Sequence, residues 1–164
     1  MNNTIFRENV TIITGASSGI GRELALQLAD RGAWLALAAR NVEKLAEVST
    51  QCNRRGGRVI TIPTDVADQS NCQALIECTV KEYGRIDTLI NNAGIGMAAG
   101  FDELEDLTIF EKVIRVNFLG SVYCTFYALP YLKKTKGRVG GVCSQRGLFP
   151  SARADAYGPS KHAM

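Results

Sequence analysis

The sequence predicts a protein of the α/β class, with a doubly wound parallel sheet covered by helices on both faces. Two observations predict this class. Short apolar runs alternate with segments of helical periodicity, and a glycine-rich stretch joins the first run to the first helical segment. Because strands connected through helices run parallel with right-handed crossovers, ligands are expected at the carboxyl ends of the strands.

The five expected strands are short apolar runs bounded by turn residues. The first run, Val-Thr-Ile-Ile, is rich in β-branched residues, and the second, Trp-Leu-Ala-Leu-Ala-Ala, is apolar throughout. The last run contains Gly140 and Gly141, which weaken a strand. The strands are expected at 10–13, 34–39, 59–62, 86–90 and 138–143.

The helices between these strands are indicated by apolar side chains at helical spacing. In the second helix, Val42, Leu45 and Val48 should face the core. In the long helix over 107–132, Pro130 should disturb the helical hydrogen bonds near the C-terminal end. The apolar part of this last helix is short for a membrane span and holds an asparagine, so a buried or interface helix is expected instead. The helices are expected at 22–31, 41–54, 69–83 and 107–132.

Composition restricts the class of protein. The length of 164 residues predicts one domain over residues 1–164, and a net charge of +3 is too small to favour nucleic-acid binding. The single histidine excludes a histidine-rich metal site, and no metal is expected. The five cysteines are odd in number and form no CxxC pair, which favours reduced thiols in the cytoplasm. The first nine residues lack the apolar core of a signal peptide.

The glycine-rich stretch TGASSGIG occupies residues 14–21, between the first strand and the first helix. Such a turn presents the free N–H groups and partial positive charge of a helix N-terminus to a phosphate. Gly15 is expected in the tight turn, Gly19 where the backbone approaches a ligand, and Gly21 where the helix packs closely. The spacing is G-x-x-x-G-x-G, and an ordinary βα loop is the alternative.

Polar residues follow the next three strands. Arg40 and Asn41 follow the second strand. At this place an acidic residue would bind the free ribose 2′-hydroxyl of NAD, whereas a basic residue would bind the 2′-phosphate of NADP. Because no acid is present and a guanidinium binds phosphate through two N–H groups, NADP is favoured over NAD. Asp65 and Val66 follow the third strand, where adenine would lie, and residues 91–94 (Asn-Asn-Ala-Gly) follow the fourth. A solvated arginine and ordinary turn residues are the alternatives.

Four residues suit proton transfer. Tyr157 and Lys161 are four residues apart, so on a helix they face the same way. An ammonium group beside a phenol stabilises the phenolate, which makes the tyrosine a usable general acid for a carbonyl oxygen. Ser144 follows the fifth strand, and Asn117 lies in an apolar helix, where an amide is costly unless hydrogen-bonded. Each of these residues also has an ordinary structural alternative. Tyr157 would then be a core residue, Ser144 a turn residue, and Asn117 a buried amide with its hydrogen bonds satisfied.

The ordered set of these residues resembles the short-chain dehydrogenase/reductase family, in its single-domain branch. The resemblance is carried by residues 14–21, 91–94, Asn117, Ser144 and 157–161. The successive intervals from the asparagine to the serine, tyrosine and lysine are 27, 13 and 4 residues. The resemblance implies a Rossmann-type sheet with strand order 3-2-1-4-5 and an oxidoreductase that uses NADP(H) to interconvert a carbonyl and an alcohol.

The resemblance also implies a role for each matching residue. Tyr157 would protonate the substrate oxygen, and Lys161 would stabilise its phenolate and bind the nicotinamide ribose. Ser144 would hydrogen-bond the substrate oxygen, and Asn117 would anchor a water next to the lysine. The implied cofactor-binding residues are Gly15, Ala16, Ser17, Ser18, Gly19 and Ile20 for the pyrophosphate, Arg40 and Asn41 for the 2′-phosphate, Asp65 and Val66 for adenine, Asn92, Ala93 and Gly94 for the neighbouring ribose, and Tyr157 and Lys161 at the nicotinamide end.

Three departures from the family pattern affect these expectations. Ser18 stands where many NADP users have a basic residue, so the cofactor preference depends mainly on Arg40. Two glycines and Cys143 replace residues that are common in the fifth strand. The chain ends at Met164, whereas family members continue through about two more strands, so the C-terminal strands are expected to be missing and the chain to be a truncated reductase.

Three classes of function remain open. A carbonyl reductase or alcohol dehydrogenase is favoured by the complete Asn-Ser-Tyr-Lys set, with a cofactor-binding module without catalysis and an interaction protein as alternatives. The substrate would be a small carbonyl or alcohol, and Phe101, Leu148 and Phe149 indicate an apolar one. The long helix over 107–132 and the helix that begins at Tyr157 resemble those of the family's dimer interface, so a homodimer or homotetramer is expected for the complete protein.

Overall fold

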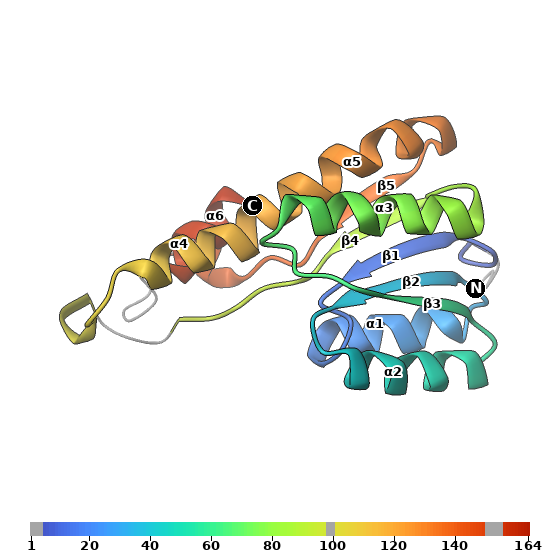
Figure 1. Ribbon diagram of the computed structural model, residues 1–164, viewed down its shortest axis with the longest axis horizontal. Helices are drawn as coiled ribbons and strands as arrows, with labels where there is room; N and C mark the ends of the chain where they lie inside the picture. Colours follow the sequence, from blue (N-terminus) through green and yellow to red (C-terminus); the bar gives the residue numbers. More distant parts are fainter. Residues whose placement is uncertain (1–4, 98–100, 150–155) are drawn as a thin grey trace.

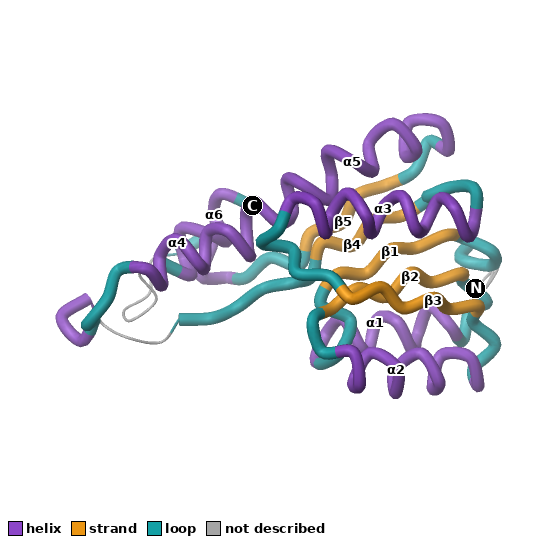
Figure 2. Tube along the Cα trace, viewed as in Figure 1, coloured by secondary structure: helices purple, strands orange, loops and turns teal. Residues whose placement is uncertain are grey.

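The computed structural model describes residues 5–97, 101–149 and 156–164. Its strands are β1 (Val10–Thr14), β2 (Trp34–Ala39), β3 (Arg58–Pro63), β4 (Thr88–Asn91) and β5 (Arg138–Gly141). Within the described ranges they form one five-stranded parallel sheet in the order β3-β2-β1-β4-β5 (Figures 1 and 2). The expected α/β class and the strand order 3-2-1-4-5 are confirmed.

Helices cover both faces of the sheet (Figure 1). One face carries α1 (Gly19–Ala29) and α2 (Val42–Arg54), and the other carries α3 (Gln69–Tyr83) and α5 (Gly120–Thr135). Two short helices, α4 (Thr108–Ile114) and α6 (Tyr157–Ala163), lie together beyond the carboxyl ends of the strands. No helix in the described part of the chain is long and apolar enough to cross a membrane.

The sheet separates two apolar clusters, because successive side chains of a strand point to opposite faces. Ile12 of β1 packs with Ile76 of α3 and Leu132 of α5, whereas the adjacent Ile13 packs with Leu45 of α2. Every residue of β1 is buried, so this strand contributes to both clusters. Because β1 is the central strand and is buried on both faces, the start of the loop that follows it is held at the middle of the sheet.

Several expected details of the first four strands and helices are wrong, among them the bounds of the first helix, which runs over Gly19–Ala29 instead of 22–31. Val42 is 55% exposed, because it is the first residue of α2 and projects beyond the residues that pack on the sheet. The fourth strand begins at Thr88 rather than at residue 86, and just before it the Asp87 side chain accepts a hydrogen bond from the backbone N–H of Val10 (2.9 Å). The boundaries of β2 and α3 agree with the expected ones.

The helix expected over 107–132 consists of three segments. Between α4 and α5 the backbone forms a π-helical turn over Arg115–Leu119, which turns Asn117 into the interior. The expected disturbance at Pro130 is not found, since α5 continues to Thr135. Pro130 is exposed, so the carbonyl that lacks its partner four residues earlier lies on the solvent side of the helix.

Candidate active site

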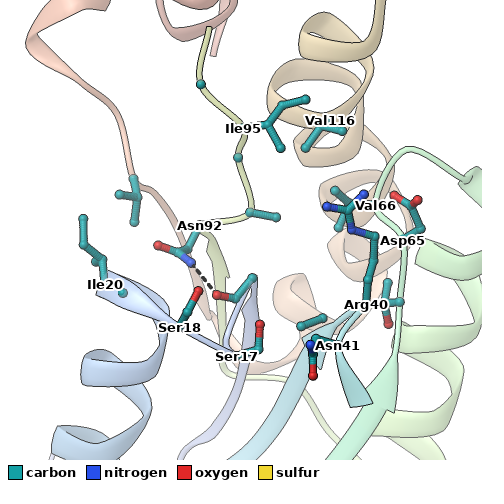
Figure 3. Close-up of a pocket in the computed structure, with 18 of the residues that line it drawn as sticks. Ser17, Ser18, Ile20, Arg40, Asn41, Asp65, Val66, Asn92, Ile95 and Val116 are labelled. Carbon is teal, nitrogen blue, oxygen red and sulfur yellow. Dashed lines mark hydrogen bonds between the residues drawn. The ribbon is translucent and has the colours of Figure 1, made fainter. Parts of the chain in front are cut away.

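A cavity of about 750 Å³ lies at the carboxyl ends of the strands (Figure 3). It includes the position between β1 and β4 where the strand order reverses, at which doubly wound sheets bind ligands. The segments that follow all five strands contribute to its lining. The lining residues are Gly15, Ser17–Ile20, Ala39–Asn41, Thr64–Val66, Asn92–Gly96, Val116, Val142–Ser144, Tyr157 and Lys161.

The glycine-rich loop forms a close turn into α1. Gly15 has a φ of +65°, and a Cβ at Gly21 would lie 2.5 Å from the Gly15 carbonyl oxygen and 2.4 Å from Asn92 Nδ2. The expected close packing at Gly21 is therefore found. Ser18 at the start of α1 makes no side-chain capping bond, and a Cβ at Gly19 would meet nothing within 4 Å. The first N–H groups of α1 are thus available to a ligand.

Thr14 joins this loop to the segment after β4, a role that sequence reasoning missed. Its Oγ1 accepts hydrogen bonds from the backbone N–H groups of Asn92 and Ala93, both at 3.0 Å. In return Asn92 Nδ2 donates to the carbonyl oxygens of Thr14 (2.8 Å) and Gly15 (3.2 Å, dashed in Figure 3). A threonine at the last position of the first strand is the one signal that could have indicated this contact.

The residues expected beside the adenosine part of the cofactor surround the opposite wall, as Figure 3 shows for Arg40, Asp65 and Val66. Arg40 is exposed, whereas Asn41 Oδ1 caps α2 by accepting from the Lys44 N–H (2.8 Å). Asp65 Oδ1 accepts from the Ala67 N–H (3.0 Å), which is the turn contact expected as its alternative role. Val66 is buried against Gly120 of α5.

Asn117 lies behind the cavity and connects three segments. The residue is fully buried, and its Oδ1 accepts from the Ile95 N–H at 2.8 Å. Its Nδ2 donates to the Ile95 carbonyl oxygen (3.0 Å) and to Ser160 Oγ (2.9 Å). These bonds satisfy the amide, so the expected alternative of a satisfied buried amide describes its present contacts.

Lys161 is held inside the protein next to Tyr157. Its side chain is almost fully buried, and its Nζ donates to the Val142 carbonyl oxygen at 2.8 Å. The same Nζ lies 6.0 Å from the centroid of the Tyr157 ring, and both residues line the cavity, as their spacing predicts. Burial lowers the pKa of Lys161 below its usual value, and the charge of the nearby Cys143 opposes this shift.

Ser144 lines the cavity at the end of β5. Its Oγ accepts from the Arg146 N–H at 3.3 Å and so caps the short 3₁₀ turn Gln145–Gly147. The expected turn role is therefore observed, and the hydroxyl hydrogen is not used in that bond. Of the expected site residues, Ala16 and Asn117 are buried behind the cavity, and the others line it.

Sequence reasoning did not single out seven further lining residues. They are Ala39, Thr64, Ile95, Gly96, Val116, Val142 and Cys143. Most are small or apolar residues next to the expected ones, and their patterns do not differ from those of core residues. In the described part of the chain no group of three His, Cys, Asp or Glu side chains could hold a metal ion.

The sheet order, the glycine-rich turn and the shared cavity define a nucleotide-binding α/β protein of the Rossmann type. A family model described as short chain dehydrogenase matches residues 9–164. The chain belongs to this family of oxidoreductases, the short-chain dehydrogenases/reductases.

Curated relatives include hydroxysteroid dehydrogenases of plants. The chain is 41% identical to 11-beta-hydroxysteroid dehydrogenase 1A of Arabidopsis thaliana, over 98% of this chain and 48% of the relative. It is 40% identical to 11-beta-hydroxysteroid dehydrogenase of Pinus massoniana, over 94% of this chain and 44% of the relative. The chain therefore spans about half the length of the curated relatives it matches.

Solved structures of the same family superpose closely on the chain. A short-chain dehydrogenase/reductase from Burkholderia phymatum in complex with NAD has a TM-score of 0.92 and 30% identity, over 96% of this chain and 57% of that one. An alcohol dehydrogenase from Thermococcus sibiricus complexed with 5-hydroxy-NADP has a TM-score of 0.91 and 30% identity, over 94% and 66% of the two chains. These similar structures thus include complexes with both types of cofactor.

Proposed function

We propose that the chain provides the cofactor site and the proton-transfer residues of an oxidoreductase that uses NADP(H) to interconvert a carbonyl and an alcohol. The observation that carries this proposal is one cavity lined both by the glycine-rich loop and by Ser144, Tyr157 and Lys161. A cofactor held by the loop would therefore extend toward the tyrosine and the lysine.

The donors around the cavity fit a dinucleotide. The uncapped N-terminus of α1 would bind the pyrophosphate together with the loop from Gly15 to Ile20. Asn92 and Ala93, fixed to Thr14, would pass close to a ribose. When bound, the nicotinamide supplies or accepts the hydride.

The preference for NADP over NAD rests on Arg40. Its exposed guanidinium lines the cavity after β2, and no acidic residue occupies the segment from Ala39 to Asn41. A guanidinium forms two charge-assisted hydrogen bonds with phosphate, and an acid would instead bind a free 2′-hydroxyl. This arrangement favours a cofactor with a 2′-phosphate.

The catalytic roles follow from the positions of three side chains on the cavity wall. Tyr157 would give a proton to the substrate oxygen in reduction and take it back in oxidation. Lys161 would stabilise the phenolate by its positive charge, because its Nζ is held beside the ring through the Val142 carbonyl. The hydroxyl hydrogen of Ser144, which is not used in the bond to Arg146, would bind the substrate oxygen and orient it.

We infer an apolar ketone or secondary alcohol as substrate. The names of the plant relatives, hydroxysteroid dehydrogenases, are consistent with such a class. Phe101, Leu148 and Phe149 are 64%, 74% and 70% exposed, and the last two follow the turn that Ser144 caps. None of these three residues lines the cavity, and their exposed apolar surface supports an apolar substrate rather than a charged one.

The proposal is tested by assaying this chain with NADPH and a panel of steroidal and smaller apolar ketones, with Tyr157→Phe as the matched variant. We expect NADPH oxidation by the unsubstituted chain and none by Tyr157→Phe, while both bind NADPH equally, because the substitution removes only the proton donor. Turnover by Tyr157→Phe at the original rate would contradict the proposed role of the tyrosine.

Cofactor binding without turnover is the second candidate function. All four residues of β5, the strand that precedes Ser144, are exposed, which supports a site that binds the cofactor without a complete substrate pocket. Clear NADPH binding with no turnover of any ketone in the panel would favour this candidate.

We also infer self-association and a reducing, cytoplasmic compartment. Val122, Phe126 and Leu129 expose apolar surface on α5, which supports a contact with a second copy. All five cysteines are free thiols, which supports the compartment. Sedimentation velocity and cell fractionation would test the two inferences.

A further inference from the structure

The hydroxyl of Ser160 lies between the residues proposed to transfer the proton and the buried Asn117. Ser160 is fully buried in α6, next to Lys161 in the sequence. Its Oγ accepts a hydrogen bond from Asn117 Nδ2 at 2.9 Å and donates one to the Tyr157 carbonyl oxygen at 2.7 Å. The single hydroxyl hydrogen is thereby used, and the direction of both bonds is fixed.

Asn117 carries this link onward to the cavity wall. Its Oδ1 and Nδ2 bond the N–H and carbonyl oxygen of Ile95, so the amide holds the backbone just after Gly94. A Cβ at Gly94 would lie 3.3 Å from Asn117 Oδ1 and 3.5 Å from Lys161 Nζ. A small shift of the amide would therefore change the space between this backbone and the ammonium group.

We propose that Ser160 is a positioning residue, whose hydroxyl sets the place of the Asn117 amide and of the Gly94–Ile95 backbone relative to Tyr157 and Lys161. This inference rests on the proposed function, because the positioned groups would face the nicotinamide end of the cofactor. Ser160 itself does not line the cavity and acts through Asn117.

Loss of the hydroxyl would leave one Asn117 amide hydrogen unpaired in a site without access to water. A buried unpaired donor is unfavourable, so the amide would rotate or move toward another acceptor. Either movement weakens its two bonds to Ile95. Alanine has nearly the volume of serine, so a residue needed only for packing would tolerate the same change.

The test uses Ser160→Ala in this chain, with Ser121→Ala as the matched control. Ser121 is also a serine that bonds Asn117. Its Oγ donates to the backbone carbonyl oxygen of Asn117 at 3.1 Å, not to the amide side chain. The first readout is the hydrogen-exchange rate of the Ile95 amide, measured by NMR without cofactor. We expect at least about tenfold faster exchange in Ser160→Ala, and no change in Ser121→Ala.

The second readout is the dissociation constant of NADPH, measured by fluorescence. We expect about tenfold weaker binding to Ser160→Ala, restoration by Ser160→Thr, and no further loss when Ser160→Ala is added to Asn117→Ala, because both act through one link. Should Ser160→Ala not fold, Ser160→Cys keeps the volume with a weaker donor and takes its place in both readouts.

The two proposals fail in different ways. An unsubstituted chain that binds neither NADPH nor NADH would contradict the proposed function, and the exchange rate of Ile95 would still decide the link through Ser160. An unchanged Ile95 exchange rate in Ser160→Ala, or losses of NADPH affinity that add fully with those of Asn117→Ala, would overturn the positioning role.

Discussion

At the scale of single residues, burial decides what each positive charge near the cavity can do. Lys161 is almost completely buried and is fixed by the Val142 carbonyl, so its charge acts at one place. Arg40 is exposed after β2, so its guanidinium can turn toward a phosphate at little cost. The first suits a fixed catalytic group, and the second suits recognition of a charged ligand.

Arg40→Ala tests the proposed preference for NADPH. We expect the NADPH dissociation constant to rise at least about tenfold and that of NADH to stay the same, because only the 2′-phosphate loses its charge-assisted bonds. Thermal-shift titration with each cofactor measures both constants. Arg54→Ala, at the other end of α2, changes the net charge equally and should alter neither; equal losses for both cofactors in Arg40→Ala would contradict the proposal.

Individual residues also show what the sequence could and could not predict. The spacing of Tyr157 and Lys161 was sufficient to place both on the cavity wall, because a helix brings residues four apart to one side. The contact of Thr14 with Asn92 and Ala93 joins residues 78 and 79 positions apart, which no local pattern indicates. Val42 fits the apolar periodicity of α2, but it is the first residue of the helix and remains exposed. Periodicity alone does not predict whether a terminal residue reaches the sheet.

At the scale of elements, the glycine-rich loop and the π-helical turn depend on backbone detail. The three glycines predicted a close approach, and the structure has it at Gly21. The turn at Arg115–Leu119 was missed, since apolar residues continue through it and a single wider turn does not interrupt their pattern. Its effect is nevertheless large, because it faces Asn117 toward Ile95 and Ser160.

Gly21→Ala should destabilise the loop. Its Cβ would lie 2.4 Å from Asn92 Nδ2 and 2.5 Å from a backbone oxygen of Gly15, so the turn and the segment after β4 must separate. We expect a loss of about 1 to 3 kcal/mol in the free energy of unfolding, measured by urea denaturation, together with weaker NADPH binding. Gly140→Ala, where a Cβ meets nothing within 4 Å, is the control and should lower neither the free energy of unfolding nor the NADPH affinity; a Gly21→Ala variant as stable as the control would contradict the described packing.

At the scale of the whole molecule, fold and site were largely predictable because one pattern repeats. Five strands joined by four helical connections fix a parallel sheet, and a parallel sheet gathers the carboxyl ends of its strands at one edge. The sequence therefore placed polar residues together without showing any contact between them. The contacts themselves depend on how α4, α5 and α6 pack, which short-range periodicity does not contain.

The stability of the folded chain should fall between pH 9 and pH 11. Burial raises the pKa of Cys52 from 9.0 to about 11, so in this range the unfolded chain loses the thiol proton first and gains stability. The expected loss is on the order of 2 to 3 kcal/mol by pH 11, and burial of Tyr83, which raises its pKa from 10.0 to about 12, adds to it above pH 10.

Urea denaturation at several pH values measures this slope in Cys52→Ala and in Cys78→Ala. The first variant should show a smaller decline above pH 9, because the buried thiol is gone. The second removes an exposed thiol and should keep the original slope. Identical slopes in the two variants would show that Cys52 does not contribute.

The central position of β1 has a consequence for the order in which the protein is made on the ribosome. β1 pairs with β2 on one side and with β4 on the other, and the Val10 N–H bonds Asp87, which is 77 residues later. Only the first three strands can assemble early, so one edge of β1 stays open until β4 has been synthesised. The nascent chain must therefore protect an unpaired apolar edge during translation, and the cofactor cavity can close only after Lys161 has emerged.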